Sequence, residues 1–180
     1  MAITQTKLFL FSLIVSSTIL TTKSELLSSK REKLTRFRLH VQNIIAGSNA
    51  TVATVAQASM TNQSATLFGQ VAVVDDVVTV DPETSSKNMG RVQGLVAFTS
   101  QSEMVLSMSM TFVFTEGKYN GSDLTVMGRN LLSLKVREMP IIGGTGLFRL
   151  ARGYVRTSTY SSDLKKGLIV LVYDFYVYHY

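Results

Sequence analysis

The sequence contains no cysteine, only two histidines and only two prolines. The absence of thiols excludes cysteine nucleophiles, thiolate metal ligands and disulfide bridges. A zinc site needs three or four ligands, and a Ser-His-Asp triad needs a histidine near a serine elbow. His40 lies in an alternating apolar segment, His179 lies beside the C-terminus, and no Gly-x-Ser-x-Gly motif accompanies either. We therefore expect no hydrolase, no metal site and no cofactor.

Residues 1–24 have the pattern of a secretory signal peptide. Lys7 precedes an apolar run of roughly 13 residues, which is too short to span a bilayer. Thr22 and Ser24, which follow this run, are small residues at the −3 and −1 positions of a cleavage site and predict cleavage after Ser24. Three Asn-x-Ser/Thr sequons, at Asn49, Asn62 and Asn120, agree with glycosylation on a secretory route. We expect a glycoprotein of the extracellular space with no membrane span.

Basic residues outnumber acidic ones by 18 to 12, a net charge of +6. Lys7 and Lys23 leave with the leader, and a further group of bases lies between Lys30 and Arg38. The remainder of the chain is nearly balanced and has no basic stripe interleaved with aromatic residues, so a nucleic-acid partner is not expected. The predicted cleavage site and the position of these bases predict a basic N-terminal arm over 25–36 and a single domain over 37–180.

The glycines Gly143, Gly144 and Gly146 resemble a phosphate-binding loop at first sight. A dinucleotide fingerprint needs Gly-x-Gly-x-x-Gly at the start of a helix, and a P-loop needs Gly-Lys-Ser/Thr. Neither pattern is present, and residues 154–159 are rich in residue types that favour strands. The glycines therefore predict a tight turn between strands.

From Arg36 onward the sequence predicts successive strands. Alternating or continuous apolar patterns occupy 37–42, 67–74, 77–80, 90–99, 104–114, 124–127, 146–159 and 168–180. Asn120-Gly121 is a strong hairpin signal, and no long amphipathic helix follows the leader. We expect an all-β domain, an eight-stranded antiparallel β-barrel, because closure removes exposed edges without disulfides.

The last predicted strand is apolar on both faces. Leu171, Tyr173 and Phe175 lie on one face, and Val170 and Val172 lie on the other. Strands of this kind are buried on both sides. With no helix to cover the second face, we expect another subunit there, and so a homo-oligomer.

Few polar residues are placed for chemistry. Asp75 and Asp76 are adjacent and would point to opposite faces of a strand, so they cannot act as a dyad. One of them could project inward, and the alternative is a turn at a strand end. Arg137 would need a carboxylate or a ligand oxygen if it pointed inward, and Glu138 cannot share its face. An outward salt bridge is the alternative for Arg137.

Several motifs together resemble the plant dirigent proteins. They are Asn-Ala-Thr at Asn49, Leu-Phe-Gly at Leu67, Val-Asp-Asp at Val74, Gly-Arg-x-Gln-Gly at Gly90, Phe-Thr-Glu-Gly-Lys-Tyr-Asn-Gly-Ser at Phe114, and Arg-Glu-Met-Pro-Ile-Ile-Gly-Gly-Thr-Gly at Arg137. The resemblance covers about Phe37 to Tyr180. It implies an eight-stranded barrel, usually trimeric, that is secreted to the apoplast.

The resemblance also implies site residues. Lignan-forming members carry two pocket acids that protonate a quinone methide; at the matching positions this chain has Asn43 and Asn130. The arginine that precedes an acid is retained as Arg137. An amide can position a phenol but cannot act as a general acid. Asn43, Asn130 and Arg137 are the catalytic candidates, and Asp75, Asp76, Phe112 and Tyr173 are the substrate-binding candidates.

Three functions remain open. In the first, a laccase or peroxidase makes phenoxy radicals from monolignols such as coniferyl alcohol, and this chain directs their coupling without oxidative activity of its own. In the second, the chain closes a ring through a quinone methide, as in pterocarpan formation. This enzymatic function is weakened by the two asparagines unless Asp75 or Asp76 supplies the acid. In the third, it binds phenolics as a defence protein.

Overall fold

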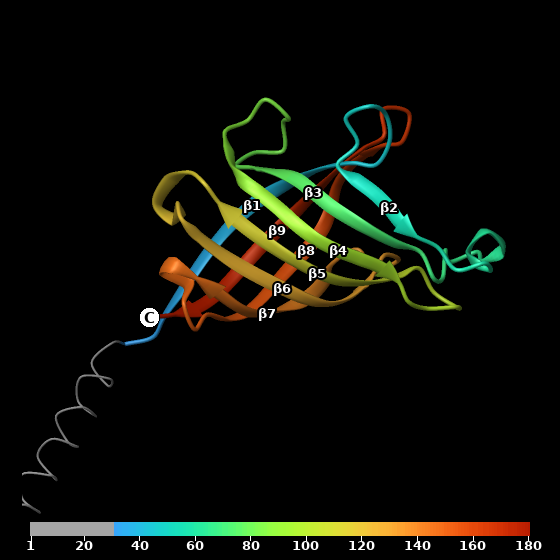
Figure 1. Cartoon of the computed structure of the whole chain (residues 1–180). Helices are drawn as coiled ribbons and strands as arrows, with labels where there is room; N and C mark the ends of the chain where they lie inside the picture. The colour runs from blue at the N-terminus through green and yellow to red at the C-terminus, as the bar shows by residue number, and fades with distance from the viewer. Residues whose placement is uncertain (1–30) are drawn as a thin grey trace, which may run out of the picture. The chain divides into compact units, whose positions relative to one another are not determined.

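Nine strands follow one another in residues 31–180, the part of the chain that the computed structural model describes (Figure 1). They are β1 (Lys33–Ile44), β2 (Val52–Ala56), β3 (Val71–Thr79), β4 (Asn88–Phe98), β5 (Val105–Phe114), β6 (Ser122–Leu131), β7 (Arg137–Thr145), β8 (Arg152–Asp163) and β9 (Leu168–His179). Short 3-10 helices lie in three connections: η1 (Thr61–Gln63), η2 (Gly117–Tyr119) and η3 (Gly146–Phe148). The predicted leader and residues 25–30 of the predicted arm lie outside the described residues.

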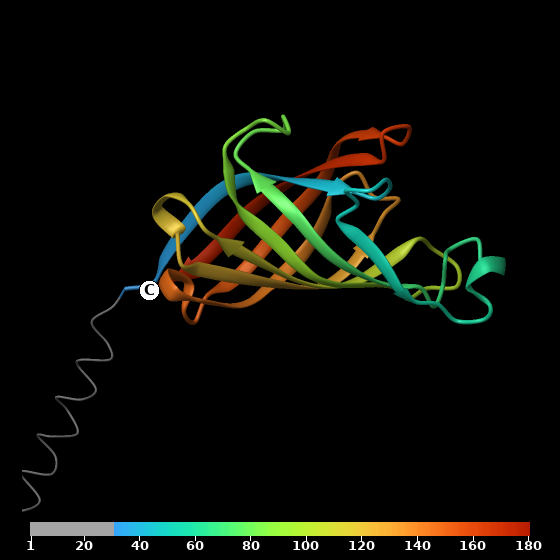
Figure 2. The ribbon, with the colours of Figure 1, turned by 45° about the horizontal axis from the view of Figure 1, so that its top comes forward.

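The strands form one antiparallel sheet in the order β1-β9-β8-β7-β6-β5-β4-β3-β2, and β1 also pairs with β3. The β1–β3 pairing, with His40 opposite Thr79, closes eight of the strands into a barrel. β2 is the additional strand; it pairs with β3 beside the point of closure and lies at the margin of the barrel (Figure 2). The predicted eight-stranded antiparallel barrel is therefore confirmed, with one extra strand.

Three local predictions differ from the structure. β1 begins at Lys33, so the last four residues of the predicted arm pair with β9. The predicted segments 67–74 and 77–80 contribute residues 71–74 and 77–79 to the single strand β3, so Asp75 and Asp76 lie inside a strand and not in a turn. β2 and the first part of β7 are not predicted, because the side chains of β2 are mostly exposed and β7 contains Pro140 and two glycines.

Aromatic side chains fill the barrel at one end. Phe37 stacks on Phe175 with ring centroids 4.6 Å apart, and Phe148 and Tyr119 pack together at 5.0 Å. Phe114 contacts Phe37 edge to face. Because η2 and η3 supply two of these rings, the β5–β6 and β7–β8 connections cover this end, next to the C-terminus (Figure 1). We call these five rings the aromatic plug.

Two glycines allow adjacent strands to approach more closely than a side chain permits. A Cβ at Gly90 would lie 1.9 Å from the carbonyl oxygen of Val113, and one at Gly153 would lie 2.0 Å from that of Tyr176. Both have φ values, +141° and +146°, that L-residues rarely adopt. These positions permit the local bending that barrel closure requires.

The outer face of β9 is covered largely within one chain. Val170 is 4% exposed and Val172 is 9% exposed. Tyr176 stacks on Tyr154 at 4.6 Å, and the guanidinium of Arg36 lies over the Tyr176 ring. The apolar outer residues of β9 therefore do not by themselves require a second subunit, contrary to the reasoning from sequence.

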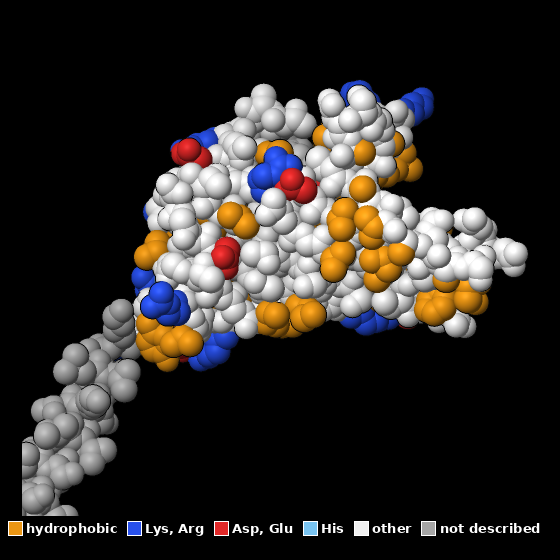
Figure 3. Space-filling model, in the orientation of Figure 1, with side chains coloured by type: hydrophobic (Ala, Val, Ile, Leu, Met, Phe, Trp, Pro, Cys, Tyr) orange, Lys and Arg blue, Asp and Glu red, His pale blue; other side chains and the backbone are white. Residues whose placement is uncertain are grey.

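Exposed apolar side chains gather elsewhere, over β2, β3 and β4 (Figure 3). Val55, Val73 and Leu95 are 58%, 40% and 51% exposed. β2 has a strand partner on one side alone within residues 31–180. We call these three residues and the adjoining edge of β2 the β2–β4 face. In the same described region, no helix is long and apolar enough to cross a membrane.

Candidate functional site

Strand alternation places polar side chains inside the barrel, toward the end opposite the aromatic plug. β1 contributes Asn43, β3 contributes Asp76, β6 contributes Asn130, β7 contributes Arg137 and β8 contributes Thr157. Each shares a strand face with buried apolar residues of the core. Buried polar groups are costly unless they are hydrogen-bonded, so such a cluster is a candidate site.

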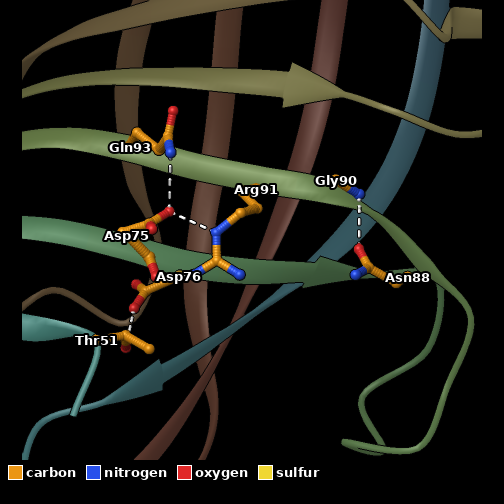
Figure 4. A network of polar contacts seen from close by, with 7 residues as sticks. All are labelled: Thr51, Asp75, Asp76, Asn88, Gly90, Arg91 and Gln93. Atoms are coloured by element: carbon orange, nitrogen blue, oxygen red, sulfur yellow. Dashed lines mark hydrogen bonds and ion pairs between the residues drawn. The ribbon is translucent and has the colours of Figure 1, made fainter. Parts of the chain in front are cut away.

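Asp76 is the acid of this cluster and is 2% exposed. Its Oδ2 accepts a hydrogen bond from Asn43 Nδ2 at 2.7 Å. Its Oδ1 accepts one from the hydroxyl of Thr51, which Figure 4 shows. Burial raises the pKa of Asp76 from an ordinary 3.8 to about 6, although both hydrogen bonds act in the opposite direction. A carboxyl with this pKa can give and take a proton near neutral pH.

Asp75 lies on the outside of the barrel. Its Oδ1 accepts hydrogen bonds from Arg91 Nε at 2.5 Å and Gln93 Nε2 at 3.1 Å (Figure 4). The hydrogen bond from Arg91 lowers the pKa of Asp75, so this carboxyl is a surface ion-pair partner. Of the two adjacent aspartates, Asp76 alone belongs to the interior cluster.

Arg137 is a buried cation, 5% exposed, on the interior face of β7. Its Nη2 donates to Thr159 Oγ1 at 3.3 Å, whereas its Nε has no hydrogen-bond partner. No carboxylate among residues 31–180 forms an ion pair with it. Burial lowers the pKa of Arg137. A buried guanidinium in this state is available to an anionic oxygen of a ligand.

Asn130 and Thr157 also have unused hydrogen-bonding capacity. Asn130 Nδ2 donates to Met108 Sδ at 3.0 Å, and Asn130 Oδ1 has no partner. Thr157 Oγ1 likewise has no hydrogen bond of good geometry, although it lies close enough to the Tyr173 hydroxyl to lower the pKa of that group; Thr157 also lies opposite Arg137 in the β7–β8 register. Unsatisfied buried polar atoms are rare in native structures, so their concentration here indicates a place for ligand atoms.

Phe112 and Tyr173 supply the aromatic surface of the cluster. Their ring centroids lie 5.1 Å apart at an interplanar angle of 62°. Burial raises the pKa of Tyr173 to about 12. The Thr157 hydroxyl and the charge of Arg137 lower this pKa, and the charge of Asp76 raises it. Tyr173 therefore remains neutral at physiological pH and links the cationic and acidic sides of the cluster.

The cluster thus combines an acid, a cation and a pair of aromatic rings inside a mainly apolar barrel. Asp76 has the protonation chemistry of an acid near neutral pH, Arg137 has a guanidinium with unused hydrogen-bond donors, and Phe112 and Tyr173 contribute aromatic rings. Such a set suits proton transfer to and from a bound phenol and stabilisation of a phenolate. No group of three or more His, Asp or Glu side chains in residues 31–180 is arranged to hold a metal.

The sequence of this chain is similar to those of known proteins. A family model described as Dirigent-like protein matches residues 34–178. The chain belongs to the dirigent family. Dirigent protein 21 of Arabidopsis thaliana is 43% identical over 159 residues, which cover 88% of this chain and 84% of the relative. Pterocarpan synthase 1 of Glycine max is 40% identical over 172 residues, which cover 95% and 92% of the two chains.

A solved structure of a pterocarpan synthase dirigent protein has the same fold. It is 42% identical, superposes with a TM-score of 0.77, and the match covers 84% of this chain and 88% of that one. The family predicted from the motifs is therefore confirmed. The relatives include both proteins named simply dirigent and proteins named pterocarpan synthase.

The sequence named Asn43, Asn130, Arg137, Phe112 and Tyr173 as site candidates and left open which of Asp75 and Asp76 points inward. The structure places Asp76 on the interior face with them, and sequence reasoning missed Thr51 and Thr157. Thr51 was considered only as part of the Asn49 sequon. Its neighbour in space, Asp76, is 25 residues away in the chain, so no spacing pattern could reveal the contact. Thr157 alternates with Val155 on β8, and that alternation was the available signal.

Proposed function

We propose that this dirigent protein binds a phenolic quinone methide inside the barrel and directs the stereochemistry of the bond that forms next. The observation that supports this most is the buried Asp76 carboxyl with a pKa of about 6 in the same interior as an Arg137 guanidinium that has no carboxylate partner in residues 31–180. The two asparagines that weakened this function at the level of sequence matter less, because Asp76 supplies an acid.

The reaction that fits these groups is dehydrative ring closure of an isoflavanol-type phenol. The substrate binds as a phenolate, its proton having passed to solvent, and Arg137 stabilises this charge. Protonated Asp76 gives its proton to the departing hydroxyl, which the phenolate electrons expel as water. The resulting quinone methide is attacked by a second phenol oxygen of the same molecule. That phenol's proton returns to the Asp76 carboxylate, and Arg137 again holds the phenolate. One water is lost, and neither an oxidant nor a reductant is used.

Asn43 and Asn130 then have roles other than proton transfer. Asn43 donates to Asp76 and so orients the acid. Asn130 has a free Oδ1 that can accept a hydrogen bond from a substrate hydroxyl. Relatives named pterocarpan synthase, in sequence and in structure, support this reaction class for the present chain.

A second candidate is the directed coupling of phenoxy radicals from monolignols, with oxidation supplied by a laccase or peroxidase. It is favoured by the mainly apolar interior around Phe112, which can hold planar phenols in fixed geometry without any proton donor. A difference of about 1.4 kcal/mol between two approaches would already give tenfold selectivity.

The test uses two reactions with the purified mature protein. In the first, a racemic isoflavanol is incubated without oxidase; in the second, coniferyl alcohol is oxidised by a laccase. Chiral chromatography is expected to show an optically active ring-closed product in the first reaction. Enantiomeric excess confined to the second, at unchanged oxidation rate, would favour radical coupling. Saturable binding with neither effect would leave a phenolic-binding protein.

We further propose secretion, glycosylation and self-association. Asn49, Asn62 and Asn120 are all exposed, which supports glycan attachment. The β2–β4 face is the surface best suited to a second copy of the chain, because it combines exposed apolar side chains with the free edge of β2.

A further inference from the structure

Thr51 is held between two strands of the barrel by its backbone. Its N–H donates to the carbonyl of Ile44 at the end of β1, at 2.8 Å, and its own carbonyl accepts from the N–H of Asp75 in β3, at 2.9 Å. The position of its side chain is therefore set by the same strands that present Asn43 and Asp76. Thr51 is the last residue of the β1–β2 connection.

The hydroxyl of Thr51 is arranged to bond Asp76 in either protonation state. It accepts a hydrogen bond from Ile44 N at 3.0 Å, which leaves one lone pair and one proton. When Asp76 is a carboxylate, the proton points to Asp76 Oδ1. When Asp76 carries a proton, the hydroxyl oxygen can accept a hydrogen bond from the carboxylic acid. Its own proton can then turn to the carbonyl of Ile44, which lies 3.4 Å away.

We propose that Thr51 is a positioning residue for Asp76: its hydroxyl exchanges between donor and acceptor as the acid gives and regains its proton. This inference rests on the proposed function. It also assigns two separate requirements to one side chain, because Thr51 is the hydroxyl residue of the Asn49-Ala50-Thr51 sequon. Removing the sequon at Thr51 would disturb the acid, whereas removing it at Asn49 would not.

Other charges around Asp76 are left in place by substitutions at Thr51. Asp75 of β3 and Arg91 of β4 act from the outer face, and Asn43 of β1 donates from inside. Tyr173 of β9, next to Arg137 of β7, shares the interior. A change in the titration of Asp76 in a Thr51 variant that remains folded can therefore be assigned to the hydroxyl.

The test compares Thr51→Val, Thr51→Ser and Asn49→Gln in the mature protein. Thr51→Val loses the hydroxyl and the sequon, Thr51→Ser keeps both, and Asn49→Gln loses the sequon alone. The titration of the Asp76 side-chain carboxyl is followed by carbon-13 NMR, and the pH profile of turnover is measured in parallel. A hydrogen bond donated to a charged carboxylate is stronger than one accepted from a neutral carboxylic acid. Loss of the hydroxyl therefore destabilises the carboxylate more than the acid, and Thr51→Val should raise the titration midpoint by about one pH unit.

Thr51→Ser and Asn49→Gln should titrate as the wild type does. A wild-type midpoint in Thr51→Val, or an equal shift in Asn49→Gln, would overturn the positioning role. Should the valine variant fail to fold, Thr51→Ala tests the same hydroxyl with less steric demand, and the same shift is expected. If the midpoint moves but the wild type turns over no phenol, Thr51 still controls Asp76 and the proposed reaction is what fails.

Discussion

Two ionisable residues give the barrel interior its chemical character, and neither is stabilised by a partner of opposite charge. Asp76 is held by two neutral donors, Asn43 and Thr51, and Arg137 by one long hydrogen bond. Groups in this condition cost stability and are typical of sites that bind or transform a ligand. Replacing either group with a neutral residue should therefore increase stability and impair function.

Asp76 should make the protein less stable as pH rises. Its pKa is raised from 3.8 to about 6 in the folded state, so the folded protein binds more protons than the unfolded chain between these values. The free energy of unfolding should fall by roughly 3 kcal/mol as pH rises from about 4 to above 6, and it should be fully retained below about pH 4. Urea unfolding of wild type and Asp76→Asn across this range measures it; the variant should lack this part of the decline, and parallel curves would contradict the shift.

Arg137→Met should increase stability and abolish stereochemical direction. The methionine keeps most of the side-chain length but removes a buried charge with one long hydrogen bond. Replacing a poorly compensated buried charge with an apolar residue is expected to add on the order of 1 kcal/mol or more. Thermal unfolding and chiral product analysis check the two effects together. A variant that keeps its selectivity would remove Arg137 from the site.

At the scale of the strands, sequence patterns predicted interior and exterior faces well. The stripe Met108, Met110, Phe112 and Phe114 is buried as its period of two indicates. The alternation also predicted that Asp75 and Asp76 would separate, although not which one points inward. Valines flank the pair on both faces of β3, so the local pattern does not specify that Asp76 shares the interior face with Val74 and Val78.

β2 and the Thr51 contact illustrate the same limit. β2 has five mostly exposed residues, so it has no apolar period to detect. Thr51 reaches Asp76 because the β1–β2 connection folds back over β3, and the sequon at Asn49 offered a sufficient local explanation for the threonine. The aromatic plug was similarly unpredicted, since its rings come from three strands and two 3-10 helices.

Gly153→Ala should destabilise the barrel strongly, whereas Gly143→Ala should not. A Cβ at Gly153 would overlap the carbonyl of Tyr176 in β9, and its φ of +146° is strained for alanine. Nothing lies within 4 Å of a Cβ at Gly143. The expected loss at Gly153 is about 3 kcal/mol or more. Chemical denaturation of both variants provides the comparison, and equal stabilities would show that β8 and β9 are not in such close contact.

For the whole molecule, closure of the sheet provides what disulfides would otherwise supply. Eight strands leave no edge except the additional strand β2, and the aromatic plug fills one end of the interior. The remaining polar interior lies at the opposite end, where the described residues bring together an acid, a cation and three neutral hydrogen-bonding groups, Asn43, Asn130 and Thr157. The aromatic plug and the candidate site therefore occupy opposite ends of one barrel.

Self-association should depend on the β2–β4 face. Leu95→Glu places a charge on this face and should shift the protein toward monomer, as measured by light scattering coupled to size-exclusion chromatography. Leu150→Glu is the matched control, since Leu150 is 75% exposed and lies in the β7–β8 connection, outside this face. A wild-type oligomer that is unchanged by Leu95→Glu would place the contact elsewhere.

The central claim is that Asp76 transfers a proton to a phenolic substrate in a stereochemically selective site. The most direct measurement is chiral chromatography of an isoflavanol reaction without oxidase, with wild type and Asp76→Asn compared from about pH 5 to about pH 8. We expect one enantiomer of the ring-closed product from the wild type, a rate that falls as pH rises through about 6, and loss of turnover in the variant. Equal turnover by Asp76→Asn, or no turnover by the folded wild type, would contradict it.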